Sequence, residues 1–185
     1  TPLHLAACNG HESVVTMLLA CGAALDETDV HGRRPLLVAC LHGQAAMARM
    51  LLARHASIES TGNDGASALL LAATSGHVAT IELLAENGAA MAQTDDDGGD
   101  ALQCACANGH HATARALLMR GANVAHTDAA GRTALIWASA CGYPRLATML
   151  LEHGSQLDAA TRTGHTALHK ACANGHEAAA RTLLW

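Results

Sequence analysis

Hydrophobic and small residues recur along the chain at an interval of 33 positions. The segment ACANGH begins at residue 105 and again at residue 171, 66 residues later, which is twice that interval. In this frame every unit has leucine at its third place and alanine at its sixth, a helical separation. The leucines of the third place are Leu3, Leu36, Leu69, Leu102, Leu135 and Leu168, and those of the eighteenth place are Leu18, Leu51, Leu84, Leu117, Leu150 and Leu183. We therefore predict two short helices in each unit, near places 2–8 and 12–20.

Glycine and polar residues separate the predicted helices. The tenth residue of every unit is glycine, and glycine also ends polar stretches such as TDVHG and TDAAG at the thirty-second place. Glycine tolerates the positive φ that a tight turn needs, and the polar stretches are typical of turns. The predicted unit is a helix, a tight turn, a second helix and an extended, hairpin-like tip. The units are 1–33, 34–66, 67–99, 100–132, 133–165 and the partial unit 166–185.

The first residue of most units favours a helix N-terminus. In five units it carries a side-chain oxygen that can accept hydrogen bonds from the N–H groups of the first turn. These residues are Thr1, Ser67, Asp100, Thr133 and Thr166, and Arg34 is the exception. Proline occupies the first helical position at Pro2, Pro35 and Pro144, where its missing N–H costs nothing.

Composition favours layers of helices over a deep core. Half of the 185 residues are apolar, but only 2% are aromatic and phenylalanine is absent. Stacked helices let small side chains bring backbones together without a thick interior. The formal charge of -5 gives no general attraction for phosphate, so we expect no nucleic-acid partner.

The cysteines and the hydropathy of the chain indicate the cellular compartment in which the protein is expected. The seven cysteines show no disulfide framework, and no N-terminal stretch has the pattern of a signal peptide. No apolar run approaches the roughly 20 residues needed to cross a bilayer. We expect an intracellular, cytoplasmic location and no membrane contact by this segment.

Three segments resemble ankyrin repeats: TPLHLAACNGH at the N-terminus, TALHKACANGH from residue 166, and GANVAHTDAAGRTAL from residue 121. That family has a 33-residue period with the motif T-P-L-H-x-A. The resemblance covers the whole chain, in about five and a half repeats. It implies an all-α solenoid of stacked helix-turn-helix units with hairpin-like tips, as one domain over residues 1–185. Because His55 replaces a recurrent glycine and Arg34 replaces a cap, we expect the second unit to be the least regular.

The resemblance also implies a role for the histidines that follow the tenth-place glycine. In ankyrin-like repeats this imidazole hydrogen-bonds to loop backbone and braces it. The histidines at this place are His11, His77, His110 and His176. Cysteines of the seventh place alternate with alanine and serine in other units, so we interpret them as small buried fillers. They are Cys40, Cys106 and Cys172.

Two segments could suggest metal binding. The densest group of potential ligands is Cys104, Cys106, His110 and His111. Two thiols separated by one residue on a helix point to different faces, so a zinc or redox site there is a weak hypothesis. The acidic stretch QTDDDGGD, residues 93–100, has alternating carboxylates, but an EF-hand frame places Cys104 where the bidentate glutamate belongs. A solvated acidic tip is the simpler interpretation.

Catalytic motifs are absent from the sequence. It contains no G-x-S-x-G elbow, no P-loop and no glycine-rich dinucleotide fingerprint. Repeat stacks offer a long groove instead of a closed pocket. We expect no enzyme activity and no cofactor.

Recognition is expected where the units differ. The resemblance places that variable surface at the tips and on the concave side of the first helices. We predict a protein–protein interaction module that binds a partner protein through this surface. Candidate contact residues are His31, Arg33, Asp64, Leu71, Asp96, Asp97, Asn108, Arg132, Trp137, Arg162, His165 and Lys170. The alternative is a structural spacer or scaffold segment of a larger repeat protein or channel.

Trp137 and the acidic tip are the most informative candidates. A large ring beside a groove is typical of an interface anchor, although a helical tryptophan can equally pack against its neighbour. Acidic residues at 95–97 and Asp100 lie between tips that carry basic residues, which favours a partner segment with basic residues at its centre. The alternative is that these charges only keep the tips solvated.

The ends of the chain resemble a cut through a longer stack. The sequence begins at a first helix and stops within a second one, without a polar terminal unit. We expect it to be part of a larger chain, with Leu183, Leu184 and Trp185 forming an apolar end face.

Overall fold

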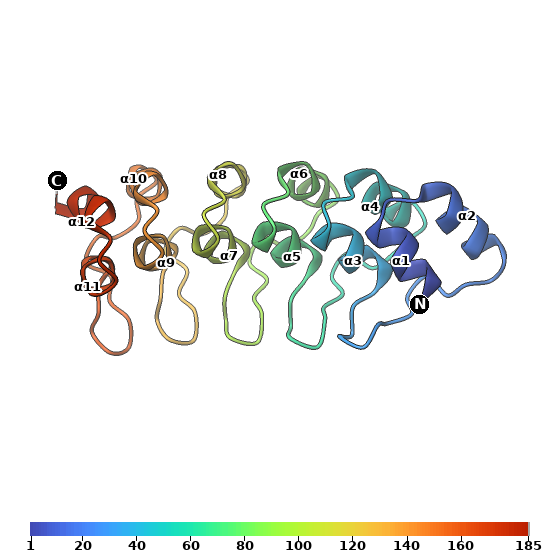
Figure 1. Ribbon diagram of the computed structural model, residues 1–185, viewed down its shortest axis with the longest axis horizontal. Helices are drawn as coiled ribbons and strands as arrows, with labels where there is room; N and C mark the ends of the chain where they lie inside the picture. The colour runs from blue at the N-terminus through green and yellow to red at the C-terminus, as the bar shows by residue number, and fades with distance from the viewer. Residues whose placement is uncertain (185) are drawn as a thin grey trace.

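The computed structural model describes residues 1–184, which form six consecutive helix pairs (Figure 1). The first helices of the pairs begin at residues 2, 35, 68, 101, 134 and 167, so each lies 33 residues after the last. The pairs are α1 (Pro2–Cys8) and α2 (Glu12–Ala20), α3 (Pro35–Leu41) and α4 (Ala45–Leu52), α5 (Ala68–Thr74) and α6 (Val78–Glu86), α7 (Ala101–Ala107) and α8 (His111–Met119), α9 (Ala134–Ala140) and α10 (Pro144–Glu152), and α11 (Ala167–Ala173) and α12 (Glu177–Leu184). Within this range there are isolated β-bridges at three tips but no strand. The predicted all-α repeat solenoid is confirmed.

The helices form two layers (Figure 1). The first helices of the pairs lie side by side in one row, and the second helices form a parallel row above them in the view of Figure 1. Each first helix contacts its partner within the pair and the first helix of the next pair. The loops that connect the pairs extend beyond the first row as a line of tips. None of the helices in residues 1–184 is long and apolar enough to span a membrane.

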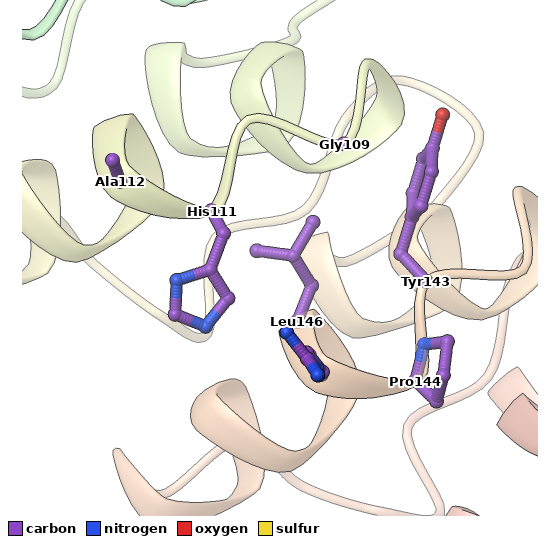
Figure 2. Close-up of a pocket in the computed structure, with 7 residues that line it drawn as sticks. Gly109, His111, Ala112, Tyr143, Pro144 and Leu146 are labelled. Carbon is purple, nitrogen blue, oxygen red and sulfur yellow. The ribbon is translucent and has the colours of Figure 1, made fainter.

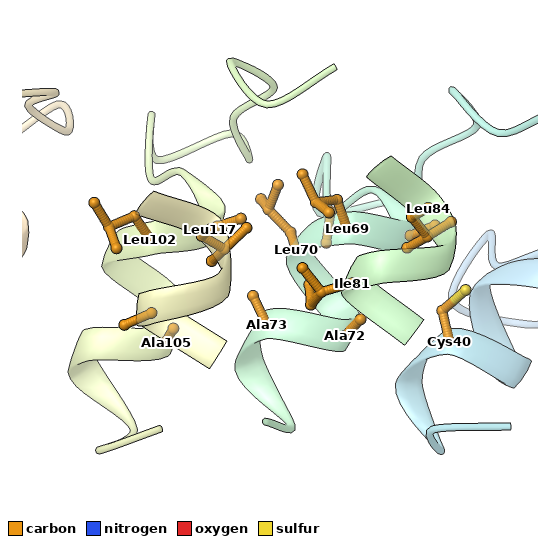
Figure 3. Close-up of a cluster of buried hydrophobic side chains, with 14 of the residues drawn as sticks. Cys40, Leu69, Leu70, Ala72, Ala73, Ile81, Leu84, Leu102, Ala105 and Leu117 are labelled. Atoms are coloured by element: carbon orange, nitrogen blue, oxygen red, sulfur yellow. The ribbon is translucent and has the colours of Figure 1, made fainter. Parts of the chain in front are cut away.

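Small and branched aliphatic side chains fill the space between the layers (Figure 3). Leu69 and Ala72 of α5 pack with Ile81 and Leu84 of α6, and all four side chains are buried. The leucine of the third place and the alanine of the sixth are buried throughout, except that Leu168 is half-buried. Each fully buried leucine stabilises the fold by about 1.5–3 kcal/mol relative to an exposed one.

Backbone hydrogen bonds connect each tip to the next. The N–H of Asn63 donates to the carbonyl of His31 at 2.9 Å, and the N–H of Asp96 donates to that of Asp64 at 3.2 Å. The same link joins Ala129 to Asp97 at 2.9 Å and Arg162 to Ala130 at 3.0 Å. The tips therefore form a continuous row whose side chains have fixed positions relative to one another.

Three of the five predicted caps are confirmed. The side chains of Ser67, Asp100 and Thr133 accept hydrogen bonds from the backbone N–H three residues later, at 3.4, 2.8 and 3.3 Å. The hydroxyls of Thr1 and Thr166 instead share hydrogen bonds with an imidazole of the first turn: Thr1 with His4 at 2.6 Å, and Thr166 with His169 at 2.9 Å. A histidine at that place competes with the backbone for the hydroxyl. All three prolines begin helices as predicted.

Imidazoles after the tenth-place glycine brace backbone of the adjacent unit, as the family resemblance implied, although the carbonyls that they contact lie at the ends of helices. Nε2 of His77, His110 and His176 bonds to the last-turn carbonyls of the preceding first helix, at 3.1, 3.0 and 3.0 Å. In the second unit Nε2 of Gln44 donates in the same way to the backbone carbonyl of Cys8 at 3.1 Å. His11 has no preceding unit within the described residues, and it is exposed. These bonds satisfy carbonyls that a helix C-terminus leaves without an intrahelical partner.

The second unit departs only slightly from the others. His55 has φ 65°, the left-handed conformation that glycine adopts at this place in the other complete units. Arg34 begins α3 without a side-chain cap, and α4 has eight residues, whereas α2, α6, α8 and α10 have nine. The backbone keeps its register because His55 accepts a strained conformation.

Two predictions about buried residues need correction. Cys40 and Cys106 are fully buried, but Cys172 is exposed because no following unit covers α11 within the described residues. Leu184 is 66% exposed, as expected for an end face, whereas Leu183 is buried against the preceding pair. Trp185 lies outside the described residues.

Candidate functional site

An open groove lies between the tips of the second to fourth units and the first helices of the third to fifth units. It consists of two adjoining cavities of about 420 and 370 Å³, which share Thr74, Asp95, Asp97 and Cys104. We call it the inner groove and define it by Asp64, Ala66, Leu70, Leu71, Thr74, Asp95, Asp96, Asp97, Gly99, Gln103, Cys104, Ala107, Asn108, Asp128, Arg132 and Trp137.

Successive first helices supply the floor of the inner groove. Leu71 of α5, Cys104 of α7 and Trp137 of α9 occupy the fifth place of their units, and each is half-buried. Thr74 and Ala107 lie three residues after Leu71 and Cys104, on the same helix face. Because the third and sixth places face the core, the fifth and eighth places face the groove.

Carboxylates of two tips form the wall of the inner groove. The Asp64 carboxylate accepts the N–H of Ala66 at 3.1 Å, and the Asp95 carboxylate accepts the N–H of Gly99 at 2.7 Å. Asp96 and Asp97 are exposed. Within residues 1–184, none of these four carboxylates forms an ion pair. The wall is therefore negatively charged and open to a cationic group.

Trp137 closes one end of the inner groove in a fixed orientation. Its Nε1–H donates to the carboxylate of Asp128 at 3.3 Å, and the guanidinium of Arg132 lies over its ring, 4.1 Å from the centroid. Asp128 is buried, and it also pairs with Nε of Arg132 at 2.6 Å. Trp137 packs against the core and lines the groove, so the two interpretations of this ring are compatible.

The thiols of Cys104 and Cys106 point to different sides of α7. Cys104 lines the inner groove, and burial raises its pKa to about 11. Cys106 lies in the core, where burial also raises its pKa. Both groups are therefore protonated thiols near neutral pH, which are poor nucleophiles and poor ligands. Residues 1–184 contain no group of three or more histidine, cysteine, aspartate or glutamate side chains placed to hold a metal ion.

Some charged residues that the sequence places at the tips are buried or paired in the structure, so the exposed charge differs from the charge pattern of the sequence. Asp100 is buried at the start of α7, where desolvation raises its pKa, so it adds no exposed charge to the acidic tip. Arg33 is paired with Asp29, with 2.9 Å between Nη2 and Oδ2. Arg162 is exposed and forms no ion pair within residues 1–184.

Seven of the twelve predicted contact residues line the inner groove: Asp64, Leu71, Asp96, Asp97, Asn108, Arg132 and Trp137. The other five lie outside it, with His31 and Arg33 at the first tip and Arg162, His165 and Lys170 in the last two units. Asp128 and Gln103 were missed. Asp128 repeats the aspartate of other tips and resembles a plain turn residue, and Gln103 occupies the place of the histidine in the TPLH motif.

Two comparisons with known proteins find ankyrin repeats along the whole chain. The family model described as ankyrin repeats in three copies matches residues 1–62, 55–128 and 123–185. The crystal structure of an ankyrin repeat domain from Acinetobacter baumannii AYE is similar at 30% sequence identity, with a TM-score of 0.85, over 99% of this chain and 96% of that one. No curated protein sequence matches the chain.

Proposed function

Because the chain belongs to the ankyrin-repeat family, whose repeats are in general protein–protein interaction modules, we propose that it binds a segment of a partner protein in the inner groove. The observation that carries this proposal is the combination of a half-buried apolar floor with an unpaired acidic wall. A groove held by a rigid stack is already formed before association, so binding requires little ordering of this chain.

The acidic wall favours a partner segment rich in lysine or arginine. Asp64, Asp95, Asp96 and Asp97 project from two adjacent tips whose backbones are hydrogen-bonded to each other. A cation at about 4 Å from one carboxylate gains about 1 kcal/mol in water, and up to about 4 kcal/mol in partly shielded surroundings. Several such pairs steer the encounter and weaken as salt is added.

The floor favours an apolar side chain between the basic residues of the partner. Leu71 and Cys104 are half-buried and line the same cavity of the groove, and Trp137 lies at the end of the groove. Apolar area removed from water there contributes about 25 cal/mol per Å². We assign Trp137 the role of anchor because its ring is already held by Asp128 and Arg132 and loses little freedom on binding.

Fluorescence anisotropy with synthetic peptides tests this proposal. The probe is a labelled peptide that alternates arginine with leucine, compared with neutral and acidic peptides of the same length. We expect the basic peptide to bind, and the triple variant D96N/D97N/W137A to bind at least about tenfold more weakly with unchanged helical circular dichroism. Binding that is equal for all three peptides, or unaffected by the triple variant, would contradict the inner groove as the site.

A matched variant separates local from general charge effects. Glu82 on α6 and Asp158 are exposed and form no ion pair within residues 1–184. The variant E82Q/D158N removes the same charge as D96N/D97N, but away from the inner groove, and should bind the basic peptide like the wild type. If no peptide binds at all, the spacer or scaffold role becomes the better account.

A further inference from the structure

A second groove lies on the opposite layer, between α8 and α10. It consists of two cavities of about 510 and 400 Å³ that share His111 and Arg145. We call it the outer groove. Figure 2 shows the larger of the two cavities, with His111 and Ala112 on the α8 side and Tyr143, Pro144 and Leu146 on the α10 side. It involves none of the residues that define the inner groove.

A change in the bracing residue contributes to the outer groove. In the third, fourth and sixth units an imidazole follows the tenth-place glycine and bonds to the preceding helix. The fifth unit has Tyr143 there, and its ring stands beside Gly109 and lines the cavity (Figure 2). From the facing helix Ala112 adds only a methyl group to the lining of this cavity, and Leu146 adds an apolar side chain from α10.

The rim of the outer groove is cationic. Arg115 and Arg145 line it, and neither guanidinium forms an ion pair within residues 1–184. His111 and His153 also line it, and Glu152 is its single acidic residue. Two arginines outnumber the one glutamate beside this apolar cavity, so the surface has the opposite net charge to the inner groove. Arginine binds carboxylates with two parallel hydrogen bonds, which makes it selective for planar acidic groups.

We propose that the outer groove binds an acidic protein segment that carries one large apolar side chain. The apolar side chain occupies the cavity between Ala112 and Leu146, next to the ring of Tyr143. Carboxylates on either side of it pair with Arg115 and Arg145. Because the inner and outer grooves lie on different layers of the stack, one molecule can hold a basic segment and an acidic segment at the same time.

The proposal is tested with a fluorescent peptide of aspartate and glutamate around a central phenylalanine. We expect it to bind the wild-type chain and to bind R115E/R145E at least about tenfold more weakly. The control is R49E, because Arg49 occupies on α4 the place that Arg115 occupies on α8 and is also exposed. R49E should bind like the wild type. Absence of binding to the wild type, or equal loss in R49E, would overturn the proposal.

A second variant tests the apolar cavity without changing charge. Ala112 is exposed, so A112W is compatible with folding, and its indole fills the cavity floor. We expect A112W to lose the preference of the wild type for phenylalanine over serine at the centre of the acidic peptide. An unchanged preference would show that the cavity is not used.

Two further measurements distinguish other occupants of the outer groove. A single-stranded oligonucleotide of equal charge should bind more weakly than the acidic peptide, and the reverse order would overturn the assignment to a protein segment. Sedimentation velocity should show that wild type and R115E/R145E have the same mass at matched concentration. Self-association that only the wild type shows would assign the groove to the acidic tips of a second copy instead. Failure of these tests leaves the proposal for the inner groove unaffected.

Discussion

The guanidinium of Arg132 lies over the ring of Trp137, and both side chains contact the carboxylate of Asp128. Asp128 also accepts the backbone N–H groups of Ala130 and Arg132, each at 2.9 Å. One buried carboxylate thus holds the fourth tip closed and fixes the residues at the end of the inner groove.

We expect D128N to lower the free energy of unfolding by about 1–3 kcal/mol, because hydrogen bonds to a charged group are stronger and the amide presents one acceptor oxygen only. Urea denaturation measures this change. The Asp97 side chain is exposed and forms no hydrogen bond within residues 1–184, so D97N should shift stability by less than about 0.5 kcal/mol. Equal effects of the two substitutions would show that Asp128 has no special role.

Acid should destabilise the first tip through Asp29. Burial raises the pKa of Asp29, but hydrogen bonds from Arg33 and His31 and the charge of Arg33 outweigh it and lower the pKa from 3.8 to about 2. A carboxylate with a lowered pKa stabilises the fold above its unfolded pKa, and this contribution disappears as pH falls from about 4 to 2. After allowance for solvent screening, we expect ionised Asp29 to contribute about 1–2 kcal/mol to the free energy of unfolding.

Urea midpoints of wild type and D29N from pH 6 to pH 2 measure this contribution. The difference between the two proteins should be largest near pH 6 and should have lost most of its size at about pH 2, the folded-state pKa of Asp29. D96N serves as the control, since Asp96 is exposed and forms no ion pair within residues 1–184. A difference that is independent of pH would assign the effect of D29N to backbone geometry instead of charge.

The strained backbone at His55 should be relieved by glycine. At φ 65° a residue with a Cβ costs roughly 1–2 kcal/mol, part of which the backbone entropy of glycine offsets. We expect H55G to raise the free energy of unfolding by about 0.5–1 kcal/mol. The reciprocal variant is G88H, where φ is 82° and a Cβ would meet no atom within 4 Å. G88H should lower stability by a similar amount, and thermal unfolding measures both.

Replacing a leucine of the eighteenth place by alanine should lower the free energy of unfolding by an amount that depends on how far neighbouring helix pairs bury that leucine. Leu117 is fully buried between pairs, whereas Leu18 in the first pair is half-buried. We expect L117A to lower the free energy of unfolding by about 2–5 kcal/mol and L18A by less than half of that. Equal losses in urea denaturation would contradict the described packing of the first pair.

The repeat frame made the helices, turns and core predictable because the same physical constraint recurs in each unit. Leu69, Ala72 and Gly76 each have a counterpart every 33 residues, so one interpretation applies to all units. Positions that depend on a neighbour were less predictable. Cys172 has the sequence surroundings of Cys106, yet it is exposed because no following unit covers it within the described residues.

The inner groove was predictable as a surface, and only in part as a set of residues. Asp96 and Trp137 stood out because they differ from their counterparts in the other units. Asp128 did not, since an aspartate recurs at several tips and its contact with Trp137 depends on a ring that only the fifth unit has. The outer groove was not predicted, because a cavity between α8 and α10 depends on how side chains of two different units are placed, and the sequence does not reveal that placement.

The helix pairs touch only the pairs beside them, so no native contact requires the two ends of the chain to meet. Folding can therefore start in any well-packed pair and spread in both directions. The folding rate should be that of a chain with low contact order. The central pairs, with neighbours on both sides, are the natural starting point, and the outer pairs should be the first to exchange their amide hydrogens.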